Sequence, residues 1–367
     1  MIPVCEPLIN KKEFEYVKEC LETGWISSQG KFIEEFEDKW AEYCGMKYGI
    51  AVSNGSVALQ VAIGCLDLKH DDEIIIPTFT IISCATAVIY NKAKPVLVDS
   101  EPLTFTINTE QIEGKITKNT KAIMPVHIYG HPCNMDPIYK LARKYDLIII
   151  EDAAEAHGAE YKGEKCGGLG DISCFSFYAN KIITTGEGGM VLTNSDDYAE
   201  KARSLRNLCF QKNKRFYHEE LGYNFRLTNI QAAIGVAQLE RISELVDKKR
   251  WIGHTYNEKL KDINGLTLPV EREWAKNVYW MYSIVLDKDI EIDAEEFAKR
   301  MHELGVGTRP FFLGMHEQPV FREMGLFKDE HYPVAERIAK QGLYLPSGLT
   351  LSESDIDFVV SAVKKAL

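Results

Sequence analysis

Residues 147–155 read LIIIEDAAE, a short apolar run that ends in two acids. A run of this length, rich in isoleucine, predicts a strand that is buried on both faces of a sheet. Runs of the same kind occur at residues 73–77 (EIIIP), 95–99 (PVLVD), 122–126 (AIMPV), 172–177 (ISCFSF) and 189–193 (GMVLT). Helical spacing of apolar residues precedes or separates them, at residues 12–21, 31–43, 57–66, 81–89 and 138–145. The alternation predicts an α/β fold, a mostly parallel sheet flanked by helices.

The pattern changes after residue 228. Residues 228–260 are predicted to form one long helical stretch, and residues 280–286 a strand. Three further helices are predicted at residues 294–304, 332–341 and 354–366. At roughly 150 residues per domain, 367 residues suggest two domains. We place a large domain at residues 1–245 and a smaller α+β domain at residues 246–367.

Composition narrows the classes of function. The chain is 45% apolar and 26% charged, as folded proteins are, and its net charge of -11 disfavours binding to nucleic acid or to an anionic membrane. Neither a transmembrane run nor a signal peptide is apparent. The nine cysteines contain no CxxC pair, which favours reduced thiols in a cytoplasmic protein over disulfides or a metal site.

Three segments carry candidate chemistry. Ser53-Asn54-Gly55-Ser56 precedes a predicted helix and offers an anion site, or only an N-cap. The acids Glu151 and Asp152 follow a buried strand, where α/β folds place ligands, although a helix cap or ion pair would also explain them. Lys181 follows the strand that ends near Ser176, and a lysine in a confined pocket can act as a nucleophile; a surface lysine is the alternative.

Together the three segments match the needs of pyridoxal 5′-phosphate. Its phosphate needs N–H and hydroxyl donors, its ring nitrogen needs a carboxylate, and its aldehyde needs an amine. The order of these parts, with Lys181 placed 29 residues after Asp152, resembles that of fold-type I aminotransferases. The glycine-rich stretch after Lys181 lacks the order of a P-loop.

The sequence resembles the DegT/DnrJ/EryC1/StrS family of nucleotide-sugar aminotransferases almost from end to end. The segments that carry the resemblance are WISS (25–28), SNGS (53–56), PTFT (77–80), MPVHIYG (124–130), EDAAEAHG (151–158), SFYANKIITTGEGGM (176–190), GYNFRLTNIQAAIG (222–235), YWMY (279–282) and RPFF (309–312). The resemblance implies the fold-type I architecture, pyridoxal 5′-phosphate as cofactor and its pyridoxamine form during turnover.

The resemblance also implies roles for individual residues. Lys181 would bond to the cofactor and later move a proton, and Asp152 would pair with the ring nitrogen. The remaining cofactor contacts would be Gly55, Ser56 and Ser176 at the phosphate, Glu155 near the 3′-oxygen, and Phe79 stacked on the ring. Relatives carry the stacking aromatic where this chain has Ile81, so core packing remains the alternative for Phe79.

Other residues are candidates for a partner subunit or for the substrate. Asn224 would reach the phosphate of the neighbouring subunit, which implies a homodimer with shared sites and leaves a tetramer open. Arg309, His316 and Arg226 are candidate substrate contacts, with a salt bridge as the alternative for Arg226. Lys212, Lys214 and Arg215 form a basic loop that either meets a diphosphate or is solvated.

The implied reaction is transfer of an amino group from glutamate to the 4-keto carbon of a nucleotide-linked 4-keto-6-deoxy sugar. The leading substrate is GDP-4-keto-6-deoxy-D-mannose, converted to GDP-perosamine for surface polysaccharide such as O-antigen. Lysine rather than histidine at position 181 favours amino transfer over dehydration. A 3- or 4-aminotransferase acting on a UDP- or dTDP-linked sugar is the first alternative. A cofactor-binding sensor without turnover is the second, and an acidic scaffold would leave the three segments unexplained.

Overall fold

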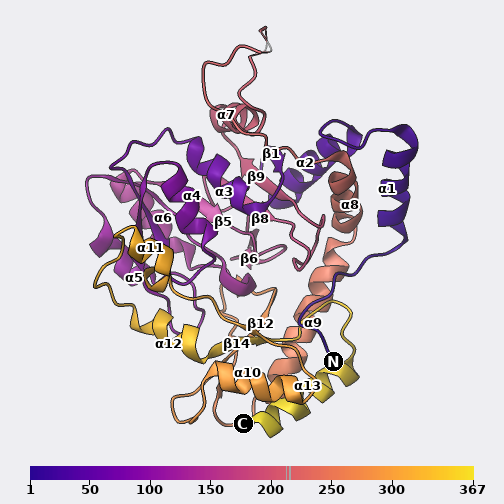
Figure 1. The fold of residues 1–367 in the computed structure, drawn as a ribbon, viewed down its shortest axis with the longest axis vertical. Helices are drawn as coiled ribbons and strands as arrows, with labels where there is room; N and C mark the ends of the chain where they lie inside the picture. The colour runs from indigo at the N-terminus through magenta and orange to yellow at the C-terminus, as the bar shows by residue number, and fades with distance from the viewer. Residues whose placement is uncertain (212, 215) are drawn as a thin grey trace.

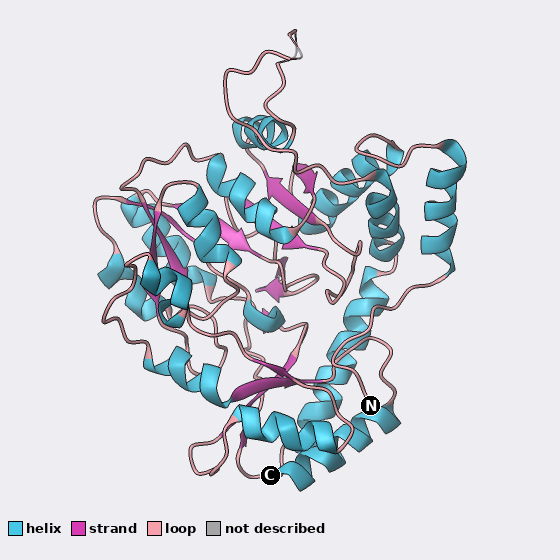
Figure 2. Cartoon of the chain, in the orientation of Figure 1, coloured by secondary structure: helices cyan, strands magenta, loops and turns pink. Residues whose placement is uncertain are grey.

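The computed structural model describes residues 1–211, 213–214 and 216–367. A seven-stranded sheet crosses the larger lobe, with helices around it (Figure 1; Figure 2). Five of its strands are parallel, β9 is antiparallel to β8, and β1 is antiparallel to β9. In spatial order the strands are β1 (Tyr48–Val52), β9 (Gly189–Thr193), β8 (Ile172–Ser176), β5 (Ile148–Asp152), β4 (Thr120–Ile123), β2 (Glu73–Pro77) and β3 (Lys94–Val98). The predicted α/β class is therefore confirmed, and the sheet is mixed.

Helices pack on the sheet through the apolar faces that the sequence indicated. α2 packs on β1, α3 on β8 and β9, and α4 on β2 and β3. The helices of this lobe are α1 (Lys11–Thr23), α2 (Lys31–Cys44), α3 (Gly55–Gly64), α4 (Ser83–Tyr90), α5 (Thr109–Ile112), α6 (Met135–Tyr145), α7 (Asp196–Arg206) and α8 (Asn229–Leu239). The elements of this lobe that were not predicted include β1, α5 and α7. In β1, Gly49 interrupts the apolar run, and a Cβ there would lie 2.3 Å from the carbonyl oxygen of Glu37 on α2.

The predicted single helix over residues 228–260 is wrong. Two helices form instead, α8 and α9 (Ile242–Leu260), and the chain leaves helical geometry at Arg241. The two halves have different partners, because α8 packs on α1 and α2 while α9 packs on α13 (Glu353–Ala366). Glu240, at the break, accepts hydrogen bonds from Lys12 and Tyr16 of α1. Apolar periodicity continues through the break, so it did not reveal the change of direction.

The C-terminal part has its own four-stranded antiparallel sheet and a second cluster of buried apolar side chains (Figure 1). The strands, in spatial order, are β10 (Leu266–Thr267), β12 (Tyr282–Leu286), β14 (Gly342–Leu345) and β13 (Arg309–Pro310); the helices are α10 (Ala294–Glu303), α11 (Pro319–Glu323), α12 (Pro333–Gln341) and α13. A small sheet of β11 (Ala275–Lys276), β6 (Glu160–Tyr161) and β7 (Glu164–Lys165) joins this part to the larger lobe. The predicted boundary at residue 245 falls inside α9 and remains a prediction.

The N-terminal segment lies against the C-terminal part rather than within the larger lobe. Ile2 forms a parallel bridge with Val306, and the carbonyl oxygen of Val4 accepts a hydrogen bond from the amide of Ser347 at 2.9 Å. The thiol of Cys5 then donates to the carbonyl oxygen of Asn180 at 3.6 Å. The segment thus joins the small lobe to the loop that carries Lys181.

Within the described ranges, no helix combines the length and the apolar character that crossing a membrane would require.

Candidate active site

A cavity of about 660 Å³ opens at the carboxyl ends of β5 and β8, where the sheet faces the small lobe. Asp152 ends β5 and Ser176 ends β8, so the parallel pairing of these strands brings the two residues to the same edge. The lining also includes Asn54, Gly55, Ser56, Thr80, Ile81, Ser83, Tyr90, Glu155, Tyr178, Lys181, Trp280, Arg309, Phe312 and Tyr344. All three segments singled out in the sequence therefore meet in one cavity.

One end of the cavity is built for an anion. Gly55 and Ser56 begin α3, where backbone N–H groups are free and the helix dipole is positive. A Cβ on Gly55 would lie 2.6 Å from Cβ of Ser176, so only glycine lets the strand end and the helix start approach this closely. The hydroxyl of Ser56 also lies 2.7 Å from that of Ser83, the first residue of α4. Two helix N-termini and three hydroxyls thus converge, a donor set that suits a phosphate group.

Asp152 lies deeper in the cavity and is 2% exposed. Its Oδ1 accepts the amide of Ala154 at 3.0 Å, and its Oδ2 accepts the thiol of Cys84 at 3.2 Å. No cation among the described residues forms an ion pair with it, and burial raises its pKa. A buried carboxylate of this kind would be stabilised by a ligand that brings an N–H⁺ group, as a protonated pyridine does.

Glu151, the neighbouring acid, faces the opposite side of the strand and is held within the protein. It accepts hydrogen bonds from Nε2 of His127 at 2.9 Å, from Oγ of Ser173 at 2.7 Å, and from the amides of residues 167, 169 and 170. Both ring nitrogens of His127 are engaged, since Nδ1 accepts the amide of Cys133 at 3.0 Å. The two neighbouring acids therefore have different surroundings. Asp152 faces the cavity, and Glu151 holds the loop that follows β7 through hydrogen bonds.

Lys181 projects into the cavity from the loop after β8. Its side chain is 9% exposed, and Nζ lies 3.8 Å from Oε1 of Glu155. Burial lowers the pKa of Lys181, while the Glu155 carboxylate opposes that change. Burial raises the pKa of Glu155 to about 7, although the charge of Lys181 acts to lower the pKa of this carboxyl. A lysine that has lost its extra proton is the form that can attack a carbonyl carbon or take up a proton.

Phe79 and His316, both predicted site residues, lie in the interior instead of lining the cavity. Phe79 is fully buried among the rings of Tyr129, Phe311 and Phe312, while Ile81 lines the cavity in its segment. The alternative of core packing thus describes where Phe79 lies. His316 is also buried, with Nδ1 at 2.8 Å from the Thr78 hydroxyl and Nε2 at 3.2 Å from the Glu336 carboxylate.

The remaining candidate residues are Arg309, the pair Asn224 and Arg226, and the basic loop. Arg309 lines the cavity, is exposed, and stays a candidate for an anionic group of the substrate. Asn224 is exposed and accepts a hydrogen bond from Nε of Arg226 at 2.8 Å, and neither residue lines this cavity. Of the basic loop, Lys212 and Arg215 lie outside the described residues, and Lys214 lies over the ring of Tyr217.

Sequence reasoning missed three residues of the site. Ser83 and Cys84 start a helix that the sequence predicted two residues too early, which hid their position at its N-terminus. Trp280 was noted only as part of the YWMY segment, although its ring lies over Lys181. No local signal could join residues 181 and 280, because their contact depends on how the small lobe packs on the larger one.

A sequence profile of the DegT/DnrJ/EryC1/StrS aminotransferase family matches residues 7–364. The chain belongs to this family. The GDP-perosamine synthase of Caulobacter vibrioides is 45% identical over 100% of this chain and 98% of its own length, and that of Escherichia coli O157:H7 is 42% identical over 99% and 98%. An aminotransferase structure from Psychrobacter cryohalolentis superposes with a TM-score of 0.92 at 31% identity, covering 98% of this chain and 97% of that one.

Membership of the DegT/DnrJ/EryC1/StrS family confirms the sequence-based assignment of an aminotransferase with the fold-type I architecture. The chain is an enzyme of the transaminase class. The roles of individual side chains are arguments from geometry: two helix N-termini for a phosphate, a buried acid for a ring nitrogen, and a buried lysine for an aldehyde. These residues supply the phosphate donors, the acid and the amine that pyridoxal 5′-phosphate requires.

Proposed function

We propose that this aminotransferase moves an amino group from glutamate to the 4-keto carbon of a nucleotide-linked 4-keto-6-deoxy sugar. GDP-4-keto-6-deoxy-D-mannose is the substrate we place first and GDP-perosamine its product, for use in surface polysaccharide such as O-antigen. The full-length similarity to the two GDP-perosamine synthases supports this choice of sugar. The observation that carries the reaction class is the meeting of Lys181, Asp152 and two helix N-termini in one cavity.

The cofactor is pyridoxal 5′-phosphate, which when bound supplies an aldehyde for the amine and a ring that draws electrons away from the reacting carbon. Residues Gly55, Ser56, Ser83 and Ser176 would hold its phosphate. Asp152 would keep the proton on its ring nitrogen, because a buried carboxylate is stabilised by that charge.

Lys181 would bind the aldehyde at rest and, once released by the amino donor, carry the proton between substrate and cofactor. Its burial favours the neutral amine that both tasks require. Glu155 lies beside it and can hold the proton when Lys181 gives it up. Ile81, Tyr344 and Phe312 surround the reacting groups with apolar surface, which reduces the water that would compete with the amino donor.

The assembly is a homodimer in this proposal, with Asn224 of each chain completing the other site, and a tetramer of two such dimers is the alternative. Exposed aromatic and aliphatic side chains at Trp25, Ile26 and Tyr178 support a contact with another protein chain, and Tyr178 also lines the cavity. The compartment we propose is the cytoplasm, supported by nine free cysteines, all but one of them buried.

The test compares Lys181→Ala with Lys162→Ala, which alters an exposed lysine paired with Asp136. Each purified variant is given pyridoxal 5′-phosphate, glutamate and 4-keto-6-deoxy sugars carried on GDP, UDP or dTDP. We expect Lys181→Ala to lose both turnover and the visible absorbance of lysine-bound cofactor, and Lys162→Ala to keep both. Turnover with UDP or dTDP sugars alone would select the alternative aminotransferases. Cofactor binding without conversion by glutamate would select the sensor.

A further inference from the structure

Trp280 contacts both ends of the lysine at the centre of the proposed site. Its ring centroid lies 3.6 Å from Nζ of Lys181, and its indole Nε1–H donates to the carbonyl oxygen of Asn180 at 2.8 Å. Trp280 is only 3% exposed, and it forms part of the cavity wall. One side chain therefore holds the backbone just before Lys181 and the ammonium group at its tip.

The two contacts act in different ways. An aromatic face attracts an ammonium group, yet it cannot accept the proton, so it holds Lys181 without competing for the proton that the reaction moves. The indole N–H bond fixes the carbonyl of residue 180 and so restricts the torsions at which Lys181 enters the cavity. Glu155 contacts the same ammonium group from another side at 3.8 Å.

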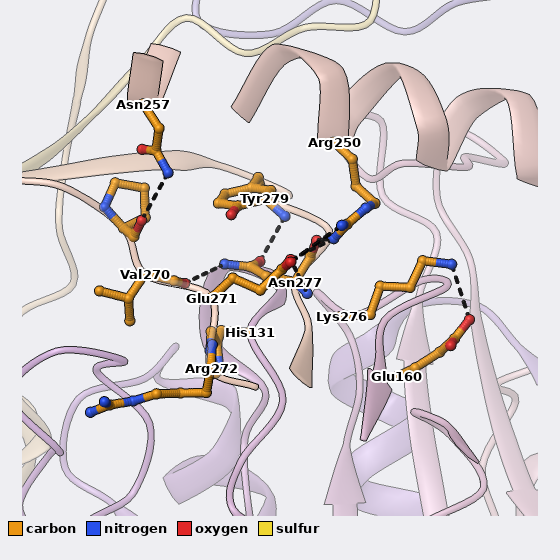
Figure 3. A network of polar contacts seen from close by, with 11 residues as sticks. His131, Glu160, Arg250, Asn257, Val270, Glu271, Arg272, Lys276, Asn277 and Tyr279 are labelled. Atoms are coloured by element: carbon orange, nitrogen blue, oxygen red, sulfur yellow. Dashed lines mark hydrogen bonds and ion pairs between the residues drawn. The ribbon is translucent and has the colours of Figure 1, made fainter. Parts of the chain in front are cut away.

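A buried polar network sets the conformation that presents Trp280 (Figure 3). Tyr279, the residue before it, has a φ of 48°, which is uncommon for a residue with a side chain. The Oδ1 atom of Asn277 accepts the amide of Tyr279 at 2.8 Å, and its Nδ2 donates to the carbonyl oxygen of Val270 at 3.1 Å. Asn277 is 3% exposed, and both polar atoms of its side chain are hydrogen-bonded within this turn.

The network continues to α9. The amide of Asn277 donates to Oε2 of Glu271 at 2.9 Å, and Arg250 pairs with Glu271 and also donates to the carbonyl oxygen of Asn277 (Figure 3). On the other side, a Cβ at Gly130 would lie 2.9 Å from the amide nitrogen of Trp280. The turn is thus confined between α9 and the loop after β4.

We propose that Trp280 is a positioning residue for Lys181, and that Asn277 sets the turn through which Trp280 reaches it. The inference rests on the proposed function, in which Lys181 is the reacting amine. It adds a residue of the small lobe to the contacts of the Lys181 side chain, beside Glu155 of the large lobe.

The experiment follows pyridoxal 5′-phosphate as it bonds to the apoenzyme, at a series of pH values, without substrate. Bonding joins Nζ to the aldehyde carbon and releases one water molecule, and it needs Lys181 without its extra proton. Visible absorbance reports the bond, and circular dichroism in the same band reports how rigidly the cofactor is held. The variants are Trp280→Phe, which keeps a ring but loses the N–H group, Trp280→Leu, which loses both, and Asn277→Ala. Trp274→Leu is the control, because Trp274 packs on His131 and Tyr161 instead.

We expect Trp280→Leu to move the midpoint of the pH profile to lower pH, with the proton affinity of Lys181 about 3- to 30-fold weaker once the ring is lost. Trp280→Phe should move it less, and both variants, with Asn277→Ala, should lower the circular dichroism of the bound cofactor. Trp274→Leu should change neither quantity. An unchanged midpoint in Trp280→Leu together with unchanged circular dichroism in Trp280→Phe would overturn the proposal. Should Trp280→Leu not fold, unchanged circular dichroism in Trp280→Phe and Asn277→Ala would overturn it. Loss of bonding in Lys181→Ala keeps the proposed function standing in either case.

Discussion

The thiol of Cys84 donates a hydrogen bond to Oδ2 of Asp152 at 3.2 Å, and the Thr80 hydroxyl lies 3.3 Å from the same sulfur. Burial raises the pKa of Cys84 well above its usual range, so the group stays a thiol and acts as the donor. The other oxygen of Asp152 is held by the amide of Ala154. The plane of this carboxylate is therefore fixed before a cofactor arrives, and a helix of the larger lobe does the fixing.

Replacing Cys84 by alanine should weaken cofactor binding. One lost hydrogen bond of about 0.5–1.5 kcal/mol corresponds to about a 2- to 12-fold rise in the Kd of pyridoxal 5′-phosphate. Cys84→Ser keeps a donor of similar size and should bind within about twofold of the native protein. Titration of the apoenzyme, followed by the quenching of tryptophan fluorescence, measures both. Equal affinities for the serine and alanine variants would show that the thiol does not act through its hydrogen bond.

The pair of Glu155 and Lys181 predicts a pH dependence. The Glu155 carboxylate helps Lys181 to keep its proton against burial, and the pKa of Glu155 itself lies at about 7. Glu155→Gln should therefore move the pH midpoint of cofactor bonding to lower pH and remove the inflection near pH 7 that the native profile should show. Glu160→Gln, which alters an acid paired with Lys165 and Lys276, is the matched control. A native profile without that inflection, and unmoved by Glu155→Gln, would contradict the assignment.

Lys249 predicts a pH dependence of stability instead. It is 2% exposed, has no carboxylate partner among the described residues, and donates to the carbonyl oxygen of Ser347. Burial lowers its pKa from 10.5 to about 8 in the folded protein. Between these two values the unfolded chain binds the additional proton, so the stability contributed by this position rises with pH over that window.

The variant Lys249→Met removes the titration. The difference in unfolding free energy between this variant and the native protein should shift by up to about 3 kcal/mol in favour of the native protein between pH 8 and pH 10.5. Thermal denaturation of both proteins at several pH values measures the shift. Lys118→Met, at an exposed lysine, should follow the native curve throughout. Parallel curves for Lys249→Met and the native protein would show that folding does not lower the pKa of Lys249.

The shared site predicts complementation between inactive chains. Asn224→Ala should lose about tenfold or more in activity if its side chain binds the partner's cofactor phosphate. A mixed dimer with Lys181→Ala would carry one site with both residues intact. Coexpression of the two variants should then restore about a quarter of the native activity, for random pairing into C₂ dimers. Activity no higher than the average of the two separate variants would place Asn224 outside the site.

The sequence was most informative where burial is uniform along an element. The runs at residues 73–77 and 189–193 are strands at those bounds, because a strand covered on both faces is a nearly continuous apolar run in the sequence. The two helices over residues 228–260 were not separable, because each buries an apolar stripe although their partners differ. Local periodicity indicates that one face of a helix is buried. It does not indicate which elements cover that face, because this depends on tertiary packing.

The candidate site divides in the same way. Lys181, Asp152, Gly55 and Ser56 were predicted, because each stands next to a strand end or helix start that the sequence marks. The different surroundings of Glu151 and Asp152 were not predicted. They follow from the alternation of side chains along β5, which places the two acids on opposite faces of the sheet. The position of Phe79 depends on its packing against Phe311, and that of His316 on its contacts with Thr78 and with Glu336 of α12. The contacting residues Phe79 and Phe311, and Thr78 and His316, are more than 200 residues apart in the sequence, so no local pattern predicts them.

The bond between Val4 and Ser347 has a consequence for how the molecule forms during synthesis. Residues 2–5 leave the ribosome long before residues 306 and 347, their partners in the small lobe, so they must wait unpaired while the central sheet assembles. Cys5, in the same segment, contacts the carbonyl oxygen of Asn180 next to Lys181, so the segment joins an early part of the chain to a late one. A chain arrested before residue 347 would lack the hydrogen bond that holds this N-terminal segment to the small lobe.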